Sequence, residues 1–554
     1  MAGIVIEHYA LELDDGTAVA LKNVQGRDLD NGDRVEATGQ RNGKAVFASA
    51  VRMLRAGSGH GVKHKANAGN TIEGTLKLLH ADHFDSGRSD FIYEVHDDAG
   101  NVKRLDFAAL PETLQPGMHV QVTGSPAADG VSVLPDTVAI TALPMDTSTS
   151  AKEVAKAVRT NNVLVILMTF TDSGAIPFTQ AQVQTVMGGG PGSGSVSEYF
   201  KEASFGQQLL NVTVTSWLAT GAATPASCNW STMGQLGRNA ATAAGFNVAS
   251  YQNLVYVFPA VSACGWSGLG YIGGNGVWIN GGNQTNVYGH ELGHNFGLLH
   301  AGSLRCSGVS IGGTCSVSEY GDPFDIMGNT SSMHYNAAQK LDLGWIAAGN
   351  VQTHTSGTKT YTLAPLENSG GTTYAVKIPA ATNRTYWLEY RQPIGFDGGM
   401  SNYPNNGAQI RVANPFETLC SGCDAWSNDT ELVDATPGTS TFTDAALTVG
   451  NTFTDSQYNI TISVSAATSG ALTVQVTSPS SLASTTTTLA SSANPANTGA
   501  LVTFTTSVTG SAPTGPVAFT ADGSTLSGCG AVALSGSGNV KTATCSTSTL
   551  TAGT

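Results

Sequence analysis

Residues 287–301, with the sequence VYGHELGHNFGLLHA, contain the pattern H-E-x-x-H-x-x-G-x-x-H. The fixed positions of this pattern are His290, Glu291, His294, Gly297 and His300. On a helix, positions i and i+4 lie on one face, so His290 and His294 can bind a single metal ion. Glycine accepts a left-handed backbone conformation without steric cost, so Gly297 allows the helix to end in a sharp turn. We expect this turn to bring His300 back as a third ligand.

Three imidazole ligands leave a fourth position open for water, which is typical of a catalytic zinc site rather than a structural one. Neutral imidazoles keep the full charge of Zn²⁺, which lowers the pKa of a bound water to roughly 7. Glu291 lies next to the first histidine, where it can accept the proton of that water and pass it to a leaving amine. The pattern therefore predicts one catalytic Zn²⁺ held by His290, His294 and His300, with Glu291 as the general base. A structural Ca²⁺ is a further option to which no residues are assigned.

A second segment, residues 319–328, has the sequence EYGDPFDIMG. It resembles the Met-turn of the metzincin metallopeptidases, with Met327 as the methionine below the metal. With residues 334–345, HYNAAQKLDLGW, the chain is similar to the gametolysin-type peptidases and their bacterial relatives over roughly residues 161–477. The resemblance implies a secreted zinc endopeptidase. Some other metzincins carry a tyrosine ligand two residues after the methionine; the corresponding residue here is Asn329, so no such ligand is assigned.

Three further residues near the two segments are candidates for supporting roles. Ligating histidines usually donate their second N–H to a carboxylate or a carbonyl, and Asp322 or Asp325 can accept it. Alternatively, Asp322 and the proline that follows it form a plain turn. His334 lies at no ligand spacing, and we expect it to have a structural or substrate-side role.

The composition indicates an extracellular protein with several domains. A chain of 554 residues is too long for one hydrophobic core. Charged residues make up only 12% of the sequence, glycine occurs 66 times and the net charge is −14. The acidic balance argues against nucleic acid and anionic membranes as partners. No stretch approaches the ~20 apolar residues that span a bilayer. The chain does not open with a signal-peptide pattern, so we expect that its secretion signal has been removed.

The eight cysteines support an oxidising compartment, because their even number and local spacing indicate disulfides. Short loops close most easily, so neighbouring cysteines are expected to pair. The expected pairs are Cys306–Cys315, Cys420–Cys423 and Cys529–Cys545, which leaves Cys228–Cys264 as the longer link.

The expected fold is a multidomain α+β protein, in which a metzincin-like catalytic core is flanked by all-β domains. The resemblance implies a core with a twisted mixed sheet, the zinc helix and the Met-turn. Apolar periodicity predicts strands near residues 161–170, 209–218, 253–261 and 273–282 and helices near 195–205 and 234–245. The expected domains are two OB-like β-barrels at 1–66 and 70–145, a linker at 146–160, the catalytic domain at 161–350, a β-sandwich at 351–477, a linker at 478–492 and a bacterial Ig-like domain at 493–554, which we expect to be incomplete.

The role of residues 1 to about 150 has two interpretations. They form either a pro-region that covers the cleft until it is removed, or a permanently attached binding module. The region contains no cysteine, so a thiolate cannot block the zinc. A block would have to come from an Asp or His of the barrels, or from steric cover alone.

We expect the protein to hydrolyse peptide bonds of extracellular or cell-wall proteins. The β modules are also suited to contacts with the cell wall or with polysaccharide. One alternative is a wall- or matrix-binding protein with an inactive core, against which the intact Glu291 argues. The other is a non-peptidase zinc amidohydrolase. Hydrolysis of casein that is lost in a chelator would separate a peptidase from both.

Overall fold

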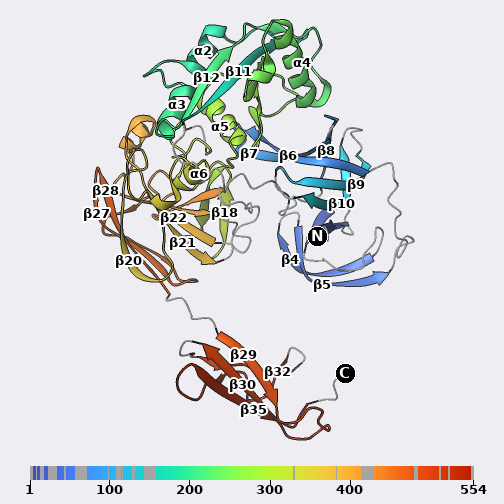
Figure 1. The fold of residues 1–554 in the computed structure, drawn as a ribbon, viewed down its shortest axis with the longest axis vertical. Helices are drawn as coiled ribbons and strands as arrows, with labels where there is room; N and C mark the ends of the chain where they lie inside the picture. Colours follow the sequence, from blue (N-terminus) through green and yellow to red (C-terminus); the bar gives the residue numbers. More distant parts are fainter. Residues whose placement is uncertain are drawn as a thin grey trace. The chain divides into compact units, whose positions relative to one another are not determined.

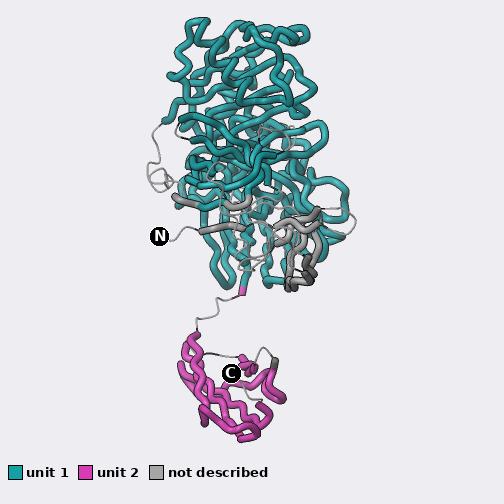
Figure 2. The backbone as a smooth tube through the Cα atoms, turned by 90° about the vertical axis from the view of Figure 1, so that its right-hand side faces the viewer, with its two compact units in different colours: residues 1–478 teal, residues 479–554 magenta. Residues whose placement is uncertain are grey.

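The computed structural model describes residues 71–142 and 158–550, except 98, 108–113, 115, 128–131, 329–330, 382–383, 414–428, 480–484, 511–512, 514, 522–523 and the side chains of 136–137, 140–142 and 524. Of residues 1–70 it describes only the backbone of β1 (Ile4–Glu7), β2 (Tyr9–Glu12), β3 (Ala18–Lys22), β4 (Arg34–Asn42) and β5 (Ala45–Arg55). The chain divides into two compact units, Met1–Ser478 and Pro479–Thr554 (Figure 2). Asn329, the Cys420–Cys423 pair and most of the expected linker at 146–160 lie outside the described residues.

The core of the first unit is a mixed sheet, as expected (Figure 1). Its parallel part consists of β12, β11, β14 and β16, and β15 pairs antiparallel with β16. These strands are β11 (Arg159–Thr169), β12 (Gln208–Val214), β14 (Asn253–Phe258), β15 (Gly268–Tyr271) and β16 (Gly276–Asn280). The short strand β13 (Leu218–Ala219) extends the pairing of β11. The strands predicted near 161–170, 209–218, 253–261 and 273–282 are confirmed.

Alternate residues of β11 point into two different apolar cores. Val163, Val165 and Leu167 pack in one core with residues of α2 (Gln180–Gly188), α3 (Val196–Ala203) and α5 (Thr285–Asn295). Leu164, Ile166 and Met168 pack in the other with α4 (Trp230–Ala243). Because successive side chains of a strand point to opposite faces, a strand covered on both faces is apolar throughout. This explains the continuous apolar run, and the helices predicted near 195–205 and 234–245 are confirmed.

The sheet continues into the N-terminal region through the long strand β6 (Thr71–His83). The sequence did not predict that a strand of this region joins the sheet of the core. The first half of β6 pairs with β9 (His119–Pro126), while its last residues pair antiparallel with β15. The neighbouring strands are β7 (Arg88–His96), β8 (Val102–Leu105) and β10 (Val133–Ala142). Figure 1 shows β6 and β7 in blue beside α5 in green. A strand of the N-terminal region therefore reaches the helix that carries the metal-binding pattern.

After the short helix α6 (Ala337–Asp342), the chain is mostly β, as predicted. One sheet has the order β18-β17-β24-β23-β22-β21-β19 with β25 beside β23, and a second has the order β20-β28-β27-β26; both contribute to one apolar core. The strands are β17 (Ala301–Cys306), β18 (Cys315–Ser318), β19 (Val351–Thr353), β20 (Gly357–Leu363), β21 (Ala375–Ala381), β22 (Arg384–Tyr390), β23 (Gly407–Ala413), β24 (Thr430–Val433), β25 (Leu447–Thr448), β26 (Thr452–Asp455), β27 (Ile460–Thr468) and β28 (Ala471–Ser478). β17 and β18 come before residue 350 in sequence, yet they belong to the first of these sheets. The expected domain boundaries stay predictions.

The second unit contains β29 (Thr485–Ser491), β30 (Val502–Gly510), β31 (Pro516–Val517), β32 (Thr520–Ala521), β33 (Ser524–Thr525), β34 (Val532–Ala533) and β35 (Val540–Thr547). Its Ig-like assignment stays a prediction. The expected disulfides Cys228–Cys264, Cys306–Cys315 and Cys529–Cys545 are confirmed. Overall, the described residues form a mostly β protein with few helices, and among them no helix is long and apolar enough to cross a membrane.

Candidate metal centre

Helix α5 and the turn after it bring the three predicted histidines together. His290 and His294 lie one turn apart on α5, and the helix ends just before Gly297, whose φ is 97°. The predicted left-handed glycine is therefore confirmed. His300 follows the turn, and its Nε2 atom lies 3.1 Å from Nε2 of His290. All three imidazoles are buried.

Each imidazole is oriented by a hydrogen bond from its Nδ1 atom. His290 donates to the carbonyl of Ile326 and His294 to the carbonyl of Leu298, each at 2.8 Å. His300 donates to Oε1 of Glu319, also at 2.8 Å. Because a carbonyl oxygen can only accept, Nδ1 of His290 and of His294 carries the proton. In the neutral ring, Nε2 then presents a lone pair toward the centre, as a metal ligand must.

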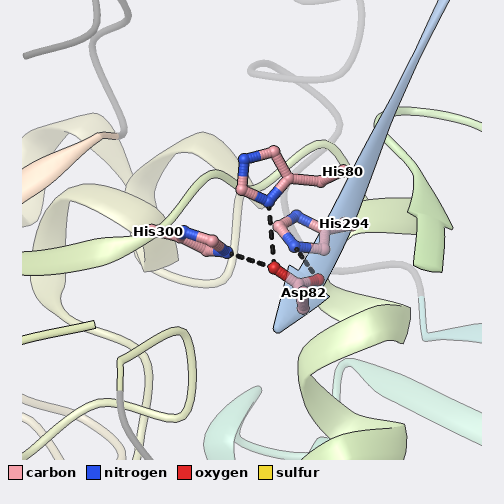
Figure 3. A group of neighbouring side chains, drawn as sticks. All are labelled: His80, Asp82, His294 and His300. Atoms are coloured by element: carbon pink, nitrogen blue, oxygen red, sulfur yellow. Dashed lines mark hydrogen bonds and ion pairs between the residues drawn. The ribbon is translucent and has the colours of Figure 1, made fainter. Parts of the chain in front are cut away.

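A carboxylate from β6 lies against these three nitrogens (Figure 3). Oδ1 of Asp82 is 3.0 Å from Nε2 of His300. Oδ2 of Asp82 is 3.3 Å from Nε2 of His294 and 3.7 Å from Nε2 of His290. His80, two residues earlier on the same strand, donates from Nδ1 to Oδ1 of Asp82 at 3.1 Å.

The donor set fits a divalent cation. Nε2 of His294 and Oδ2 of Asp82 are buried and face each other, yet neither atom has a hydrogen-bond partner among the described residues. Two such lone pairs repel unless a positive charge lies between them. Imidazole nitrogens and a carboxylate oxygen are ligands that Zn²⁺ takes in proteins. The residues present therefore suit zinc.

The charges of the cluster differ from group to group. Burial lowers the pKa of His290 to about 4. His300 is buried too, but its hydrogen bonds to Asp82 and Glu319 outweigh burial and raise its pKa to about 9. Burial also disfavours the charge of Asp82, but the surrounding imidazoles hold its pKa well below the usual range. An ionised carboxylate therefore stands among the three histidines.

Glu291 is buried beside this cluster, and neither of its carboxylate oxygens has a hydrogen-bond partner among the described residues. Burial, and after it the charge of Asp82, raises the pKa of Glu291 well above its usual range. The carboxylate fits only because two residues of β15 lack side chains. A Cβ added to Gly268 would overlap Oε1 of Glu291, and a Cβ added to Gly270 would lie 3.1 Å from Oε2.

Met327 lies against the face of α5 that carries Gly293. A Cβ added to Gly293 would meet the sulfur of Met327 at 2.5 Å, and a Cβ added to Gly289 would meet Ile326 at 2.6 Å. Two glycines spaced i, i+4 thus let the segment around Met327 approach the helix closely. This approach places the carbonyl of Ile326 within reach of His290.

Asp322 and Asp325 do not orient a ligating histidine in the way considered from the sequence. Asp322 accepts from the backbone N–H of Phe324 and Asp325 from that of Met327, at 2.8 and 2.9 Å. These contacts are those of Asx turns, which hold the backbone locally. The carboxylate that orients a ligating histidine is that of Glu319.

His334 has a structural environment, which agrees with one of the two expected roles. It is buried, its Nδ1 accepts from the ammonium of Lys340 at 3.2 Å, and its Nε2 donates to Glu202 at 3.0 Å. Burial, and then the charge of Lys340, lowers its pKa.

Sequence reasoning missed His80, Asp82, Glu319 and Tyr320. Tyr320 donates its O–H to Oδ1 of Asp82 at 2.7 Å. The only sequence signal for the first two is H-x-D in a strand, where positions i and i+2 share a face. Nothing in that signal indicates which other part of the chain the strand meets.

The family model of gametolysin peptidase M11 matches residues 162–389. A sequence search finds no match among curated proteins. The matched residues contain the three histidines, Glu291 and the segment around Met327. This part of the chain is therefore gametolysin-like, and the protein is a metallopeptidase.

Proposed function

We propose that the protein is a secreted, zinc-dependent endopeptidase whose metal is held by His290, His294 and His300. One observation carries the proposal: three Nε2 atoms converge in a buried site beside the carboxylate of Glu291, whose oxygens have no hydrogen-bond partner among the described residues. Zinc bound there would polarise the scissile carbonyl and make a water more acidic. The disulfides support an oxidising, extracellular location.

Glu291 is the general base of the proposed reaction. It takes a proton from the attacking water while the water oxygen bonds to the scissile carbonyl carbon. It then gives that proton to the amide nitrogen as the C–N bond breaks. Neither oxygen of Glu291 has a hydrogen-bond partner in the described part of the chain, so both are open to the water and to the amide nitrogen. Burial and the charge of Asp82 raise the pKa of Glu291, whereas a cation at the three histidines would favour the ionised form that acts as the base.

The substrate is proposed to be an extended peptide of an extracellular or cell-wall protein. β15 lies beside Glu291 and pairs with β16 along one edge. Extended peptides bind sheet edges by adding a strand, and backbone hydrogen bonds then hold them with little sequence preference. A peptide on the other edge of β15 would run past the metal centre.

The test compares the wild type with Glu291→Gln after the region before residue 158 has been removed. Brief trypsin treatment, stopped with a serine-protease inhibitor, removes this region when it cuts after Lys152 or Lys156, and mass spectrometry of the product identifies the site that was cut. Glu291→Gln should keep one zinc per chain and lose casein hydrolysis by several orders of magnitude, since the carboxylate is a base and not a ligand. A mutant that retains more than a few per cent of activity would remove Glu291 from this role.

The metal assignment has its own test. His290→Ala, His294→Ala and His300→Ala should each lower the zinc content measured by elemental analysis of the full chain. A chelator should abolish casein hydrolysis by the wild type, and added Zn²⁺ should restore it. Full zinc occupancy in His300→Ala would exclude His300 as a ligand.

A further inference from the structure

We propose that Asp82 is the fourth ligand of the metal centre and that the N-terminal region keeps the peptidase latent until it is removed. This inference rests on the proposed function, because it needs a metal at the three histidines. Among the two interpretations of residues 1 to about 150, it favours the pro-region. It also names the donor that takes the place of a thiolate.

The position of the Asp82 carboxylate is that of a fourth ligand. Each of the three Nε2 atoms lies between 3.0 and 3.7 Å from one of its two oxygens. A tetrahedral zinc held by three histidines has one position left, and in an active peptidase that position belongs to water. Candidate ligand atoms of Asp82, His290 and Glu291 lie within 4.8 Å of one another. The carboxylate therefore fills the space in which Glu291 would meet the attacking water.

Hydrogen bonds from His80 and Tyr320 orient the carboxylate of Asp82 toward the three histidines. Oδ1 accepts from Nδ1 of His80 at 3.1 Å and from the hydroxyl of Tyr320 at 2.7 Å. Oδ2 has no hydrogen-bond partner among the described residues and points toward His294 (Figure 3). One oxygen is thus held in place while the other is left free to bind a cation. The carboxylate is fully buried, so its charge needs such a partner.

β6 also occupies the sheet edge that the substrate would use. It pairs antiparallel with β15, with Asp82 opposite Gly268 and His80 opposite Gly270. These are the two glycines that make room for Glu291. A peptide cannot add to this edge of β15 while β6 is there. The N-terminal region therefore blocks the metal centre and the peptide-binding edge together.

Further contacts hold the blocking segment against the rest of the unit. Glu94 of β7 accepts from the indole N–H of Trp230 at 3.0 Å and from the hydroxyl of Tyr271 at 2.9 Å. The hydroxyl of Ser89 donates to Glu319 at 3.0 Å. Phe84 packs edge-on against the ring of His290. All of these contacts are non-covalent and the region has no cysteine, so a cut between it and β11 would leave no covalent bond that retains it.

The experiment uses the full chain with zinc, and a cobalt-substituted form of it. Asp82→Ala and the milder Asp82→Asn are compared with wild type and with Asp85→Ala, a matched loss of an exposed carboxylate on the same segment. The first readout is hydrolysis of a small fluorogenic peptide. The second, independent of activity, is the visible spectrum of the Co²⁺ form before and after addition of a small hydroxamate.

Wild type and Asp85→Ala should show little hydrolysis and no spectral response to the hydroxamate. Both Asp82 variants should respond to the hydroxamate, which needs only the metal, but they should gain little hydrolysis because β6 still covers the edge of β15. Wild type cleaved with trypsin, then treated with inhibitor, should respond to the hydroxamate and hydrolyse the peptide at least tenfold faster than the intact protein, because it has lost both Asp82 and β6. Equal rates and equal hydroxamate responses of intact and cleaved wild type would overturn the proposal. So would loss of the metal from Asp82→Asn and from the cleaved protein, since Asp82 would then belong to a permanently closed site.

The outcomes separate this inference from the proposed function. If no form of the protein holds zinc at the histidines, the proposed function fails and the inference fails with it. If intact wild type holds zinc, hydrolyses the peptide and binds the hydroxamate, only the inference fails. If the Asp82 variants and the cleaved protein bind the hydroxamate but the cleaved protein hydrolyses nothing, Asp82 is confirmed as the blocking ligand and the peptidase function fails.

Discussion

Glu319 orients His300 for metal binding. Oε1 of Glu319 accepts two hydrogen bonds, one from Nδ1 of His300 and one from the hydroxyl of Ser89. A carboxylate in this position fixes the ring and makes its other nitrogen a stronger donor. Losing it leaves the imidazole free to turn.

We therefore expect Glu319→Ala to weaken zinc binding by roughly 10- to 100-fold, the usual effect of removing such a partner. Competition with a zinc chelator of known affinity would measure the change in the full chain. Glu73→Ala, which removes an exposed carboxylate of β6, should leave zinc affinity unchanged. Equal affinity in Glu319→Ala and Glu73→Ala would contradict the role of Glu319.

The sequence predicted those site residues that one local pattern fixes. His290, His294 and Gly297 are related by helix geometry, so their positions follow from spacing alone. Asp82 could not be identified in this way. Its role arises because β6 pairs with β15, and strand pairing depends on contacts between segments far apart in the chain. The sequence alone indicated only that some Asp or His of the N-terminal region could serve as a donor.

β15 must lack side chains at Gly268 and Gly270, where Glu291 approaches the strand. An added methyl group at Gly268 would overlap the carboxylate of Glu291 and displace it. Displacement of a catalytic group by about 1 Å can cost roughly 100-fold in rate. β15 therefore constrains the general base from outside the helix that carries it.

Gly268→Ala should reduce the kcat of the cleaved, active protein by roughly 100-fold while the zinc content stays at one per chain. Steady-state rates on a fluorogenic peptide and elemental analysis would measure both. Gly174→Ala is the matched control, because an added Cβ there has no neighbour within 4 Å. Loss of zinc together with activity would show that the substitution disturbs the ligands rather than Glu291.

Helices and strands could be predicted from the sequence where packing against an apolar core on one or both faces gives a recognisable pattern of apolar residues. β11 is apolar throughout because its alternate residues enter two cores. β17 illustrates the limit. It follows the turn after His300 and was assigned to the catalytic domain, yet it pairs with β24 in the sheet of the β-rich part. A strand's own sequence indicates that it is a strand, but not which partner it has.

The β-rich part after residue 350 supports the metal centre. Arg411 of β23 binds Asp322 in the segment that holds Met327, with 2.7 Å between Nη2 and Oδ2. Glu389 of β22 accepts from the backbone N–H of Ala337 at 2.7 Å. Asp322 and Arg411 are buried, and a buried charge that loses its partner costs about 3–5 kcal/mol of folding free energy.

A chain that ends at residue 350 should therefore not form the site, although it contains all the residues of the metal-binding pattern. It would lose β24 as the partner of β17 and Arg411 as the partner of Asp322. We expect no cooperative thermal transition and no zinc at stoichiometric level. A chain that ends at Ser478, where the first compact unit ends, should unfold cooperatively and bind one zinc. Calorimetry and elemental analysis of the two chains would measure the difference. Cooperative unfolding and one bound zinc in the shorter chain would show that the catalytic part folds independently of the β-rich part.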